Sequence, residues 1–201
     1  MVTKTKSLKT PLRYPGGKSR AITKMSQFFP DMKEYTHFRE PFLGGGSVAL
    51  WVTKQFPNVL IWVNDLYEPL YNFWSQLQQH GHWIEHTLKI LKTDHPNPTH
   101  ARRLFEESKK YVSDKDVDPV WRAVYFYVVN KCSFSGLTES SSFSAQASDS
   151  NFSMRGIEKL PEYQEIISHW HINQYSYEYC FRENVHDGLF MYLDPPYDIK
   201  D

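Results

Sequence analysis

The stretch THFREPFLGGGSVALWVTKQFPNVLIWVND, residues 36–65, decides the fold expected for this chain. Its first residues predict a strand, the three glycines a loop, and residues 47–54 a helix for which Ser47 is a candidate cap. A second strand is expected over residues 59–63, and Asp65 stands just beyond its end. In nucleoside-binding βαβ units, an acid about 20 residues beyond a glycine loop meets ribose hydroxyls. The sequence therefore predicts an α/β fold with a nucleoside-binding site.

Two better-known phosphate-binding patterns do not fit the glycines of this chain. The triplet lacks the later glycine of the dinucleotide fingerprint, because residues 47–49 are Ser-Val-Ala. Gly17-Lys18-Ser19 resembles the end of a phosphate loop, but Leu12 stands where that loop requires its first glycine. A nucleotide triphosphatase of the phosphate-loop class is therefore excluded.

A second informative stretch, Asp194-Pro195-Pro196-Tyr197, follows an apolar, strand-like run over residues 188–193. Two consecutive prolines cannot continue a helix or a central strand, so they predict a stiff, extended turn at the end of the strand. Such a turn fixes one carboxylate, one backbone carbonyl and one aromatic face. This arrangement suits methylation of the exocyclic amine of a nucleobase, which donates hydrogen bonds to oxygens while its ring stacks on an aromatic.

Composition and charge narrow the classes of protein that the chain can represent. The longest apolar run, residues 123–129, is too short to span a membrane, and no N-terminal segment has the pattern of a secretion signal. Cys132 and Cys180 have no paired spacing, which predicts reduced thiols in a cytoplasm. The formal net charge is zero, yet seven basic residues precede the first acid, Asp31, and predict a stripe that meets phosphates or a carboxylate, with a solvated, partly disordered tail as the alternative for residues 4–9. The seven basic residues are Lys4, Lys6, Lys9, Arg13, Lys18, Arg20 and Lys24.

The middle of the chain changes character. Helices are expected over residues 68–92, from about residue 99, and over residues 120–129, before a serine-rich loop that is either a linker or a binding loop. Three phenylalanines lie in that loop. They suit stacking against bases, and packing back onto the body is the alternative for the second and third. They are Phe134, Phe143 and Phe152.

A zinc site is the rival interpretation within the first of these helices. His82-Trp83-Ile84-Glu85-His86 fits the His-x-x-Glu-His pattern of one group of metallopeptidases. A pattern with three fixed positions arises easily by chance in a chain with nine histidines, and Gly81 before it suggests a helix break. A surface helix is therefore favoured, and no metal is expected.

Five blocks of the chain together resemble a Dam-type adenine-N6 DNA methyltransferase, of the class that uses S-adenosylmethionine. They occur in that family's order and cover essentially the whole chain. The resemblance implies a Rossmann-like methyltransferase sheet with an inserted, mainly helical DNA-recognition region. The blocks are Leu12-Arg13-Tyr14-Pro15-Gly16-Gly17-Lys18, Glu40-Pro41-Phe42-Leu43-Gly44-Gly45-Gly46-Ser47, Asn64-Asp65-Leu66, residues 130–137 and Asp194-Pro195-Pro196-Tyr197.

The resemblance also implies a cofactor site and a catalytic turn. Asp194 and the carbonyl of Pro195 would accept hydrogen bonds from the amine of a flipped adenine, on which Tyr197 would stack. Lys18 suits the carboxylate of the cofactor, and Asp65 its ribose hydroxyls. The implied catalytic residues are Asp194, Pro195, Pro196 and Tyr197, and the implied cofactor-binding residues are Tyr14, Gly17, Lys18, Phe42, Gly44, Gly46, Asp65 and Asp194.

Double-stranded DNA is the partner that the resemblance implies. Residues 1–93 and 171–201 would form the catalytic domain, and residues 94–170 the inserted target-recognition region. Phe134 stands where the family has a wedge aromatic that enters the base stack, and Arg13 where it has a lysine that touches a guanine. The implied DNA-binding residues are Arg13, Asn130, Lys131, Ser133, Phe134 and Ser135.

Two departures from the family limit what is carried over. Glu139 stands where GATC-specific relatives have a base-reading arginine, and because glutamate repels phosphate, GATC is not assumed as the target. The family continues with further strands after its Asp-Pro-Pro-Tyr turn, so a fragment, a second chain that completes the sheet and a degenerate relative are all open. The 201 residues alone are expected to bind cofactor poorly and to methylate slowly or not at all.

The alternatives to a bacterial or phage-encoded, cytoplasmic adenine methyltransferase are three. A truncated relative would act as a DNA-binding module, with affinity for DNA but none for the cofactor. The same acidic turn also serves amine methylation on cytosine N4 or on a protein glutamine.

Overall fold

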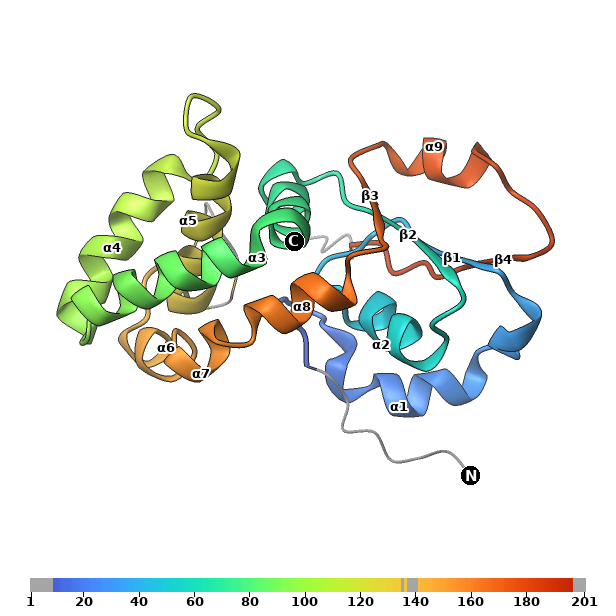
Figure 1. The fold of residues 1–201 in the computed structure, drawn as a ribbon, viewed down its shortest axis with the longest axis horizontal. Helices are drawn as coiled ribbons and strands as arrows, with labels where there is room; N and C mark the ends of the chain where they lie inside the picture. The colour runs from blue at the N-terminus through green and yellow to red at the C-terminus, as the bar shows by residue number, and fades with distance from the viewer. Residues whose placement is uncertain (1–8, 135, 137–140, 197–201) are drawn as a thin grey trace, which may run out of the picture.

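The computed structural model describes residues 9–134, 136 and 141–196, and a four-stranded parallel sheet lies at its centre (Figure 1). The strands are β1 (His37–Glu40), β2 (Leu60–Asn64), β3 (His171–Asn173) and β4 (Leu189–Met191), in the order β3-β2-β1-β4. Every neighbouring pair is parallel. The expected α/β fold with a Rossmann-like sheet is confirmed.

The strand order places a crevice at the end of β1. His37 pairs with Leu60 of β2 on one side and with Leu189 of β4 on the other, so the chain winds away from β1 in both directions. In open α/β sheets, such a switch in strand order leaves room for a ligand beyond the carboxyl ends of the strands. The glycine loop after β1, Asp65 after β2 and Asp194 after β4 all lie at that edge.

Nine α-helices are described. In Figure 1, α1 and α2 lie below the sheet, α9 lies above it, and α3 to α8 extend to the left. Three short 3₁₀ turns, η1 (Lys18–Arg20), η2 (Ser26–Phe28) and η3 (Met32–Glu34), flank α1. The α-helices are α1 (Ile22–Met25), α2 (Ser47–Gln55), α3 (Glu68–Asp94), α4 (Pro98–Tyr111), α5 (Pro119–Cys132), α6 (Ala145–Ser150), α7 (Met154–Ile157), α8 (Leu160–Ile166) and α9 (Tyr177–Arg182).

The long elements match their expectations to within a few residues, whereas the serine-rich region does not. The prediction that Ser47 caps α2 is wrong, because Gly46 takes the cap position in a left-handed conformation and leaves Ser47 as the first helical residue. Residues 145–152 were expected within a loop, yet α6 forms there, and α7 and α8, for which no separate elements were predicted, follow it. Two of these helices start at serine caps: Ser144 accepts from the amide of Ala147, and Ser153 from that of Gly156. Helices this short carry too few turns for an apolar period to be recognised.

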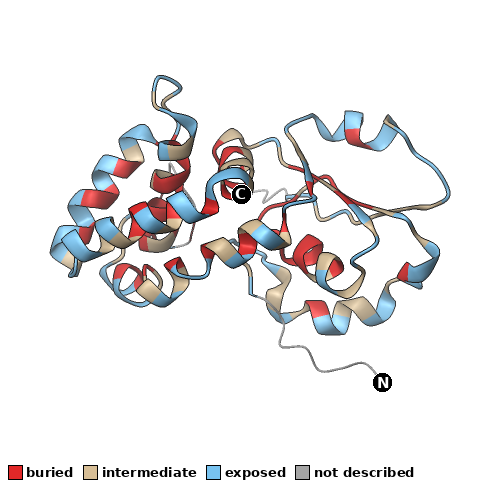
Figure 2. Cartoon of the chain, viewed as in Figure 1, coloured by how far each residue is buried: buried red, intermediate tan, exposed pale blue. Residues whose placement is uncertain are grey.

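Packing explains why the middle helices form one body. Most of α5 is buried (Figure 2). Phe73 of α3 stacks on Phe126 and Tyr127 of α5. Phe152 is completely buried, and Phe143 packs on Phe105, which confirms that these two phenylalanines belong to the body.

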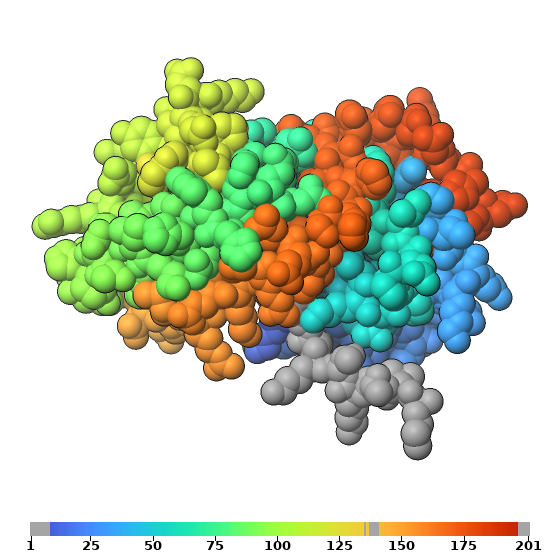
Figure 3. Space-filling view, in the orientation of Figure 1, coloured from blue at the N-terminus to red at the C-terminus, as the bar shows by residue number. Residues whose placement is uncertain are grey.

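Helix α3 joins the sheet to the helical part of the molecule. It starts after β2, kinks at His80, where φ is −134° and ψ is 25°, and continues among α5, α7 and α8. A Cβ at Gly81 would lie 2.7 Å from Gln164 of α8, so the kink needs a glycine to let the helices touch. The kink precedes the predicted domain boundary at residues 93 and 94, which stays a prediction. Figure 3 shows the two parts in continuous contact.

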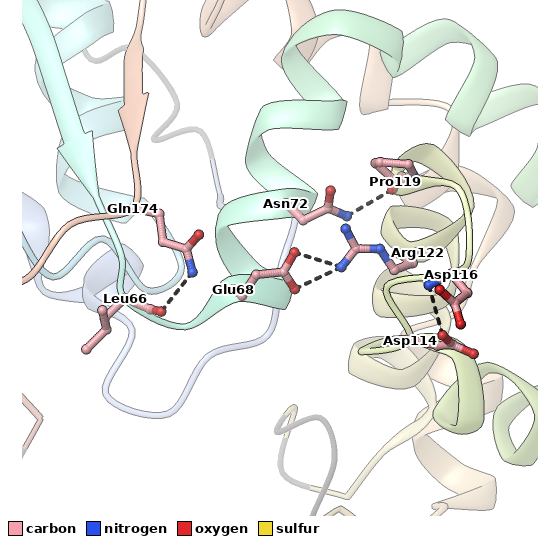
Figure 4. A network of polar contacts seen from close by, with 8 residues as sticks. All are labelled: Leu66, Glu68, Asn72, Asp114, Asp116, Pro119, Arg122 and Gln174. Carbon is pink, nitrogen blue, oxygen red and sulfur yellow. Dashed lines mark hydrogen bonds and ion pairs between the residues drawn. The ribbon is translucent and has the colours of Figure 1, made fainter.

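A polar network fixes the start of α3 to the start of α5 (Figure 4). Arg122, which is mostly buried, donates to both carboxylate oxygens of Glu68 at 2.7 and 2.9 Å, and Asn72 donates to the carbonyl of Pro119 at 2.9 Å. These bonds hold the start of α5 against the start of α3. Among the residues that the structure describes, no helix has the length and apolar character needed to cross a membrane.

Candidate active site

A cavity of about 1050 Å³ lies beyond the carboxyl ends of β1, β2 and β4. Its volume is at the upper end of the range for small-molecule sites, roughly 300–1,000 Å³. The cavity brings together every described residue predicted to bind cofactor or to act in catalysis. These are Tyr14, Gly17, Lys18, Phe42, Gly44, Gly46, Asp65, Asp194, Pro195 and Pro196. Tyr197 lies outside the described residues.

The glycine loop forms one wall because its backbone is left-handed at two positions. Gly44 has a φ of +49° and Gly46 a φ of +67°, a region that L side chains rarely adopt. Added Cβ atoms would lie 2.7 Å from the ring of Tyr14 at Gly44 and 2.8 Å from the ring of Trp74 at Gly46. The indole N–H of buried Trp74 donates to the carbonyl of Gly44 at 3.1 Å. The loop is thus clamped between two aromatic rings.

Asp65 is held by the same loop. One carboxylate oxygen accepts from the amide of Gly44 at 2.9 Å, and the other from the amide of Tyr67 at 3.1 Å. Burial raises the pKa of Asp65, and the two amide bonds oppose this rise. A carboxylate has about four acceptor positions, so two bonds leave it able to accept from a ligand hydroxyl.

Lys18 and Asp194 meet across the cavity. The Lys18 ammonium lies 2.7 Å from a carboxylate oxygen of Asp194 and donates to the carbonyl of Gly16 at 2.8 Å. Their side chains are 20% and 28% exposed, so this ion pair faces the cavity without being cut off from solvent. The lysine expected to bind the cofactor and the carboxylate expected to bind the target amine therefore hold each other here.

Glu40 is a cavity residue that sequence reasoning did not single out. It ends β1, is buried, and accepts a hydrogen bond from the amide of Ala49 at 2.9 Å. Burial holds its pKa well above the usual range, and the carboxylates of Asp194 and Asp65 raise it further. Its place directly before Pro41 in the strand-to-loop motif was the available signal. With Glu40 protonated, the carboxylates of Asp65 and Asp194 still outnumber the ammonium of Lys18 in the cavity, which favours a ligand that carries positive charge.

Aromatic side chains from α9 and its flanks close the cavity on another side. Tyr177 lies with its ring centroid 6.0 Å from that of Phe42, and Tyr175 and Phe181 also line the cavity. Arg39 fixes α9, because its guanidinium donates to the carbonyls of Cys180 and Glu183, at 2.6 Å each. These aromatics were missed because they stand on a six-residue helix whose orientation depends on a distant arginine.

The residues predicted to contact DNA lie outside the cavity, around the C-terminal end of α5. Phe134 is 79% exposed, whereas Asn130 and Ser133 are completely buried. The ammonium of Lys131 lies 5.2 Å from the ring centroid of Tyr127, and burial lowers its pKa to about 8, with a further contribution from the charge of Arg13. The guanidinium of Arg13 donates to backbone carbonyls of this same segment. Ser135 and Glu139 lie outside the described residues.

The metallopeptidase pattern falls on the second half of α3. Both its histidines, His82 and His86, are exposed, and Glu85 instead pairs with Lys89 at 3.0 Å, one turn along the helix. Within the described part of the chain, no group of three or more His, Cys, Asp or Glu side chains is arranged to hold a metal ion.

The chain is similar to known methyltransferases. The model of the D12 class N6 adenine-specific DNA methyltransferase family matches residues 14–201. The Type II methyltransferase M1.LlaDCHI of Lactococcus lactis subsp. cremoris is 26% identical over 202 residues, covering 92% of this chain and 64% of that protein. The Type II methyltransferase M.CviBI of Paramecium bursaria Chlorella virus NC1A is 22% identical over 196 residues, covering 95% of this chain and 70% of that protein. The chain thus spans about two thirds of the length of these relatives.

Proposed function

The chain belongs to the D12 class N6 adenine-specific DNA methyltransferase family, and we propose that it transfers a methyl group from S-adenosylmethionine to the N6 amine of an adenine in double-stranded DNA. One observation carries the proposal: Asp194, the acid of the Asp-Pro-Pro turn, shares a cavity with Asp65 and the left-handed glycine loop. A nucleoside-binding wall and an amine-binding acid thus face the same space.

The residues present fit the cofactor. Asp65 would accept from ribose hydroxyls, Lys18 would bind the carboxylate of the methionine part, and the backbone of Gly44 and Gly46 leaves room for close approach. Two carboxylates, Asp65 and Asp194, against one lysine suit a ligand with a sulfonium and an ammonium group. Bound S-adenosylmethionine would supply an electrophilic methyl group.

Asp194 would bind the target base. Its carboxylate and the carbonyl of Pro195 accept hydrogen bonds from the N6 amine, which draws the nitrogen lone pair out of the ring. As positive charge develops on that nitrogen, the fixed carboxylate stabilises the transition state electrostatically. Asp194 pairs with Lys18 through one carboxylate oxygen in this structure, so turning Lys18 to another anion would free the whole carboxylate for the amine. A cofactor carboxylate is such an anion, so cofactor is expected to bind before the target adenine.

The inserted helical region would hold the DNA. Phe134, which is exposed just beyond the end of α5, would enter the base stack and so offset the cost of base extrusion, which is a few kcal/mol. Basic residues near it would meet phosphates. The target sequence is not assigned.

Transfer of a labelled methyl group from S-adenosylmethionine to unmethylated DNA tests the proposal. We expect label in DNA with the native protein and none with Asp194→Ala. Asp187→Ala is the matched control, because Asp187 is an exposed aspartate at the opposite end of β4. Equal labelling by Asp194→Ala and Asp187→Ala would contradict the assignment of the catalytic acid. DNA binding without cofactor binding would favour a DNA-binding module instead.

A further inference from the structure

The segment that carries the exposed Phe134 is tied at several points to Arg13. The guanidinium of Arg13 donates through one nitrogen to the carbonyl of Ser133 at 2.5 Å and through another to the carbonyl of Phe134 at 2.9 Å. On the other side, the amide of Phe134 donates to the carbonyl of Ser142 at 3.0 Å. Both the amide and the carbonyl of Phe134 are thus held by hydrogen bonds, while its ring stays exposed.

Asn130 completes the connection from inside the protein. Its side chain accepts from the amide of Arg13 at 2.9 Å and donates to the carbonyls of Arg13 and Gly136, at 2.7 Å each. Gly136 has a φ of +76°, and a Cβ there would lie 2.7 Å from the carbonyl oxygen of Arg13. Because Asn130 is completely buried, it cannot reach a nucleic acid. Its bonds instead fix the backbone of Arg13 against the segment.

The residue after Arg13 belongs to the other site. The ring of Tyr14 packs on the glycine loop so closely that a Cβ at Gly44 would lie 2.7 Å from it, and Tyr14 lines the cofactor cavity. A continuous series of contacts therefore runs from the glycine loop through Tyr14 and Arg13 to the backbone of Phe134. Two neighbouring residues connect the cavity with the exposed aromatic.

We propose that Arg13 and Asn130 are positioning residues that couple occupancy of the cofactor cavity to the placement of Phe134 on the DNA-facing surface. This deepens the proposed function and rests on it. Arg13 then acts through the carbonyls of residues 133 and 134 rather than by contact with DNA, which departs from the role expected from the family resemblance. A guanidinium suits this task, because its donors form a rigid fork that spans two acceptors, whereas a lysine ammonium offers a single point of charge.

Hydrogen exchange of backbone amides, with and without S-adenosylhomocysteine, tests the coupling in the full chain. We expect the ligand to slow exchange at Gly44, whose amide is bonded to Asp65, and at Phe134 by about fivefold or more, the lower end of typical coupling. In Arg13→Ala and Asn130→Ala, slowing at Gly44 should remain, and slowing at Phe134 should fall below about twofold. Arg13→Lys should restore only part of it.

Controls separate positioning from a general loss of stability. Asn72→Ala removes another buried asparagine bond of the helical part, and Arg103→Ala removes an exposed arginine of α4. In both control variants, S-adenosylhomocysteine should still slow hydrogen exchange of the Phe134 amide. If the ligand still slows amide exchange at Phe134 in Arg13→Ala, the inference is overturned while the cofactor site stands. No slowing at Gly44 in the native protein would overturn the cofactor site, and the inference with it.

Salt dependence of binding to a duplex separates positioning from direct contact. A residue that neutralises a phosphate contributes about 0.9 to the slope of log K against log salt concentration. We expect Arg13→Ala to weaken binding with that slope unchanged, and buried Asn130→Ala to do the same. A slope that falls by about 0.9 in Arg13→Ala alone would show that Arg13 contacts phosphate and would overturn the inference.

Discussion

Replacing Gly46 with alanine should destabilise the fold and damage the cofactor cavity together. At a φ of +67°, an L residue in the left-handed region costs about 1–2 kcal/mol. The new Cβ would also lie 2.8 Å from the ring of Trp74, which is completely buried and cannot turn away. Overpacking of this kind costs about 1–3 kcal/mol. The two effects together predict a loss of about 2–5 kcal/mol in the free energy of unfolding.

Gly16→Ala separates the two contributions. Gly16 has a similar φ of +72°, but the nearest atom to its added Cβ is the flexible Lys18 ammonium, 3.8 Å away. Only the backbone cost applies there, about 1–2 kcal/mol. The difference between the variants therefore reports the collision with Trp74 and should be about 1–3 kcal/mol.

The assay is urea unfolding, fitted with one common slope of unfolding free energy against urea concentration for all variants. Calorimetric titration with S-adenosylhomocysteine measures ligand binding in the cavity. Because Trp74 also holds the carbonyl of Gly44, Gly46→Ala should weaken ligand binding as well. Equal unfolding free energies for Gly46→Ala and Gly16→Ala would refute the reasoning, since they would mean that the loop is not pressed against Trp74.

Five further substitutions probe the site and its support. Asp194→Asn keeps the shape but loses the charge that stabilises the transition state, and should lower the methyl-transfer rate by about 10²–10³ in single-turnover kinetics; an unchanged rate would remove its catalytic role. Lys18→Met should weaken S-adenosylhomocysteine binding by about tenfold in calorimetry, since it removes a charged hydrogen bond, and unchanged affinity would mean that the ligand carboxylate lies elsewhere. Glu40→Gln should flatten the dependence of Tm on pH. Burial raises the pKa of Glu40 above its ordinary 4.5, so the folded protein keeps a proton that the unfolded chain releases. The stability of the native protein therefore falls as pH rises above 4.5, by at most about 1.4 kcal/mol per pH unit. Parallel Tm profiles for this variant and the native protein would contradict that. Arg122→Met should cost about 2 kcal/mol in urea unfolding, less than the 3–5 typical of fully buried pairs because the side chain of Glu68 is 29% exposed, and Glu68→Gln should recover part of it.

The sheet and the cavity floor could be predicted because each depends on local sequence. The strand before the glycine loop, the second strand that ends near Asp65 and the proline turn after Asp194 each carry their own signal in neighbouring residues. Parallel strands bring such ends to one edge of a sheet, so the cavity follows from the order of the motifs. The predicted cofactor residues that the structure describes all line it.

What could not be predicted depends on contacts between distant residues. Glu40 reads as an ordinary strand residue until its burial among other carboxyls is seen. Arg13 reads as a free cation in a basic stripe, yet its guanidinium is used by two carbonyls far along the chain. The short helices over residues 145–166 form because the body is there to pack against, and their serine caps were the one local sign.

Mass-spectrometric analysis of nucleosides from DNA incubated with the protein and S-adenosylmethionine tests the central claim most directly. The account predicts N6-methyladenine as the methylated nucleoside, absent when Asp194 is replaced by alanine and present when Asp187 is. N4-methylcytosine in place of N6-methyladenine, or N6-methyladenine that persists without the carboxylate of Asp194, would contradict it.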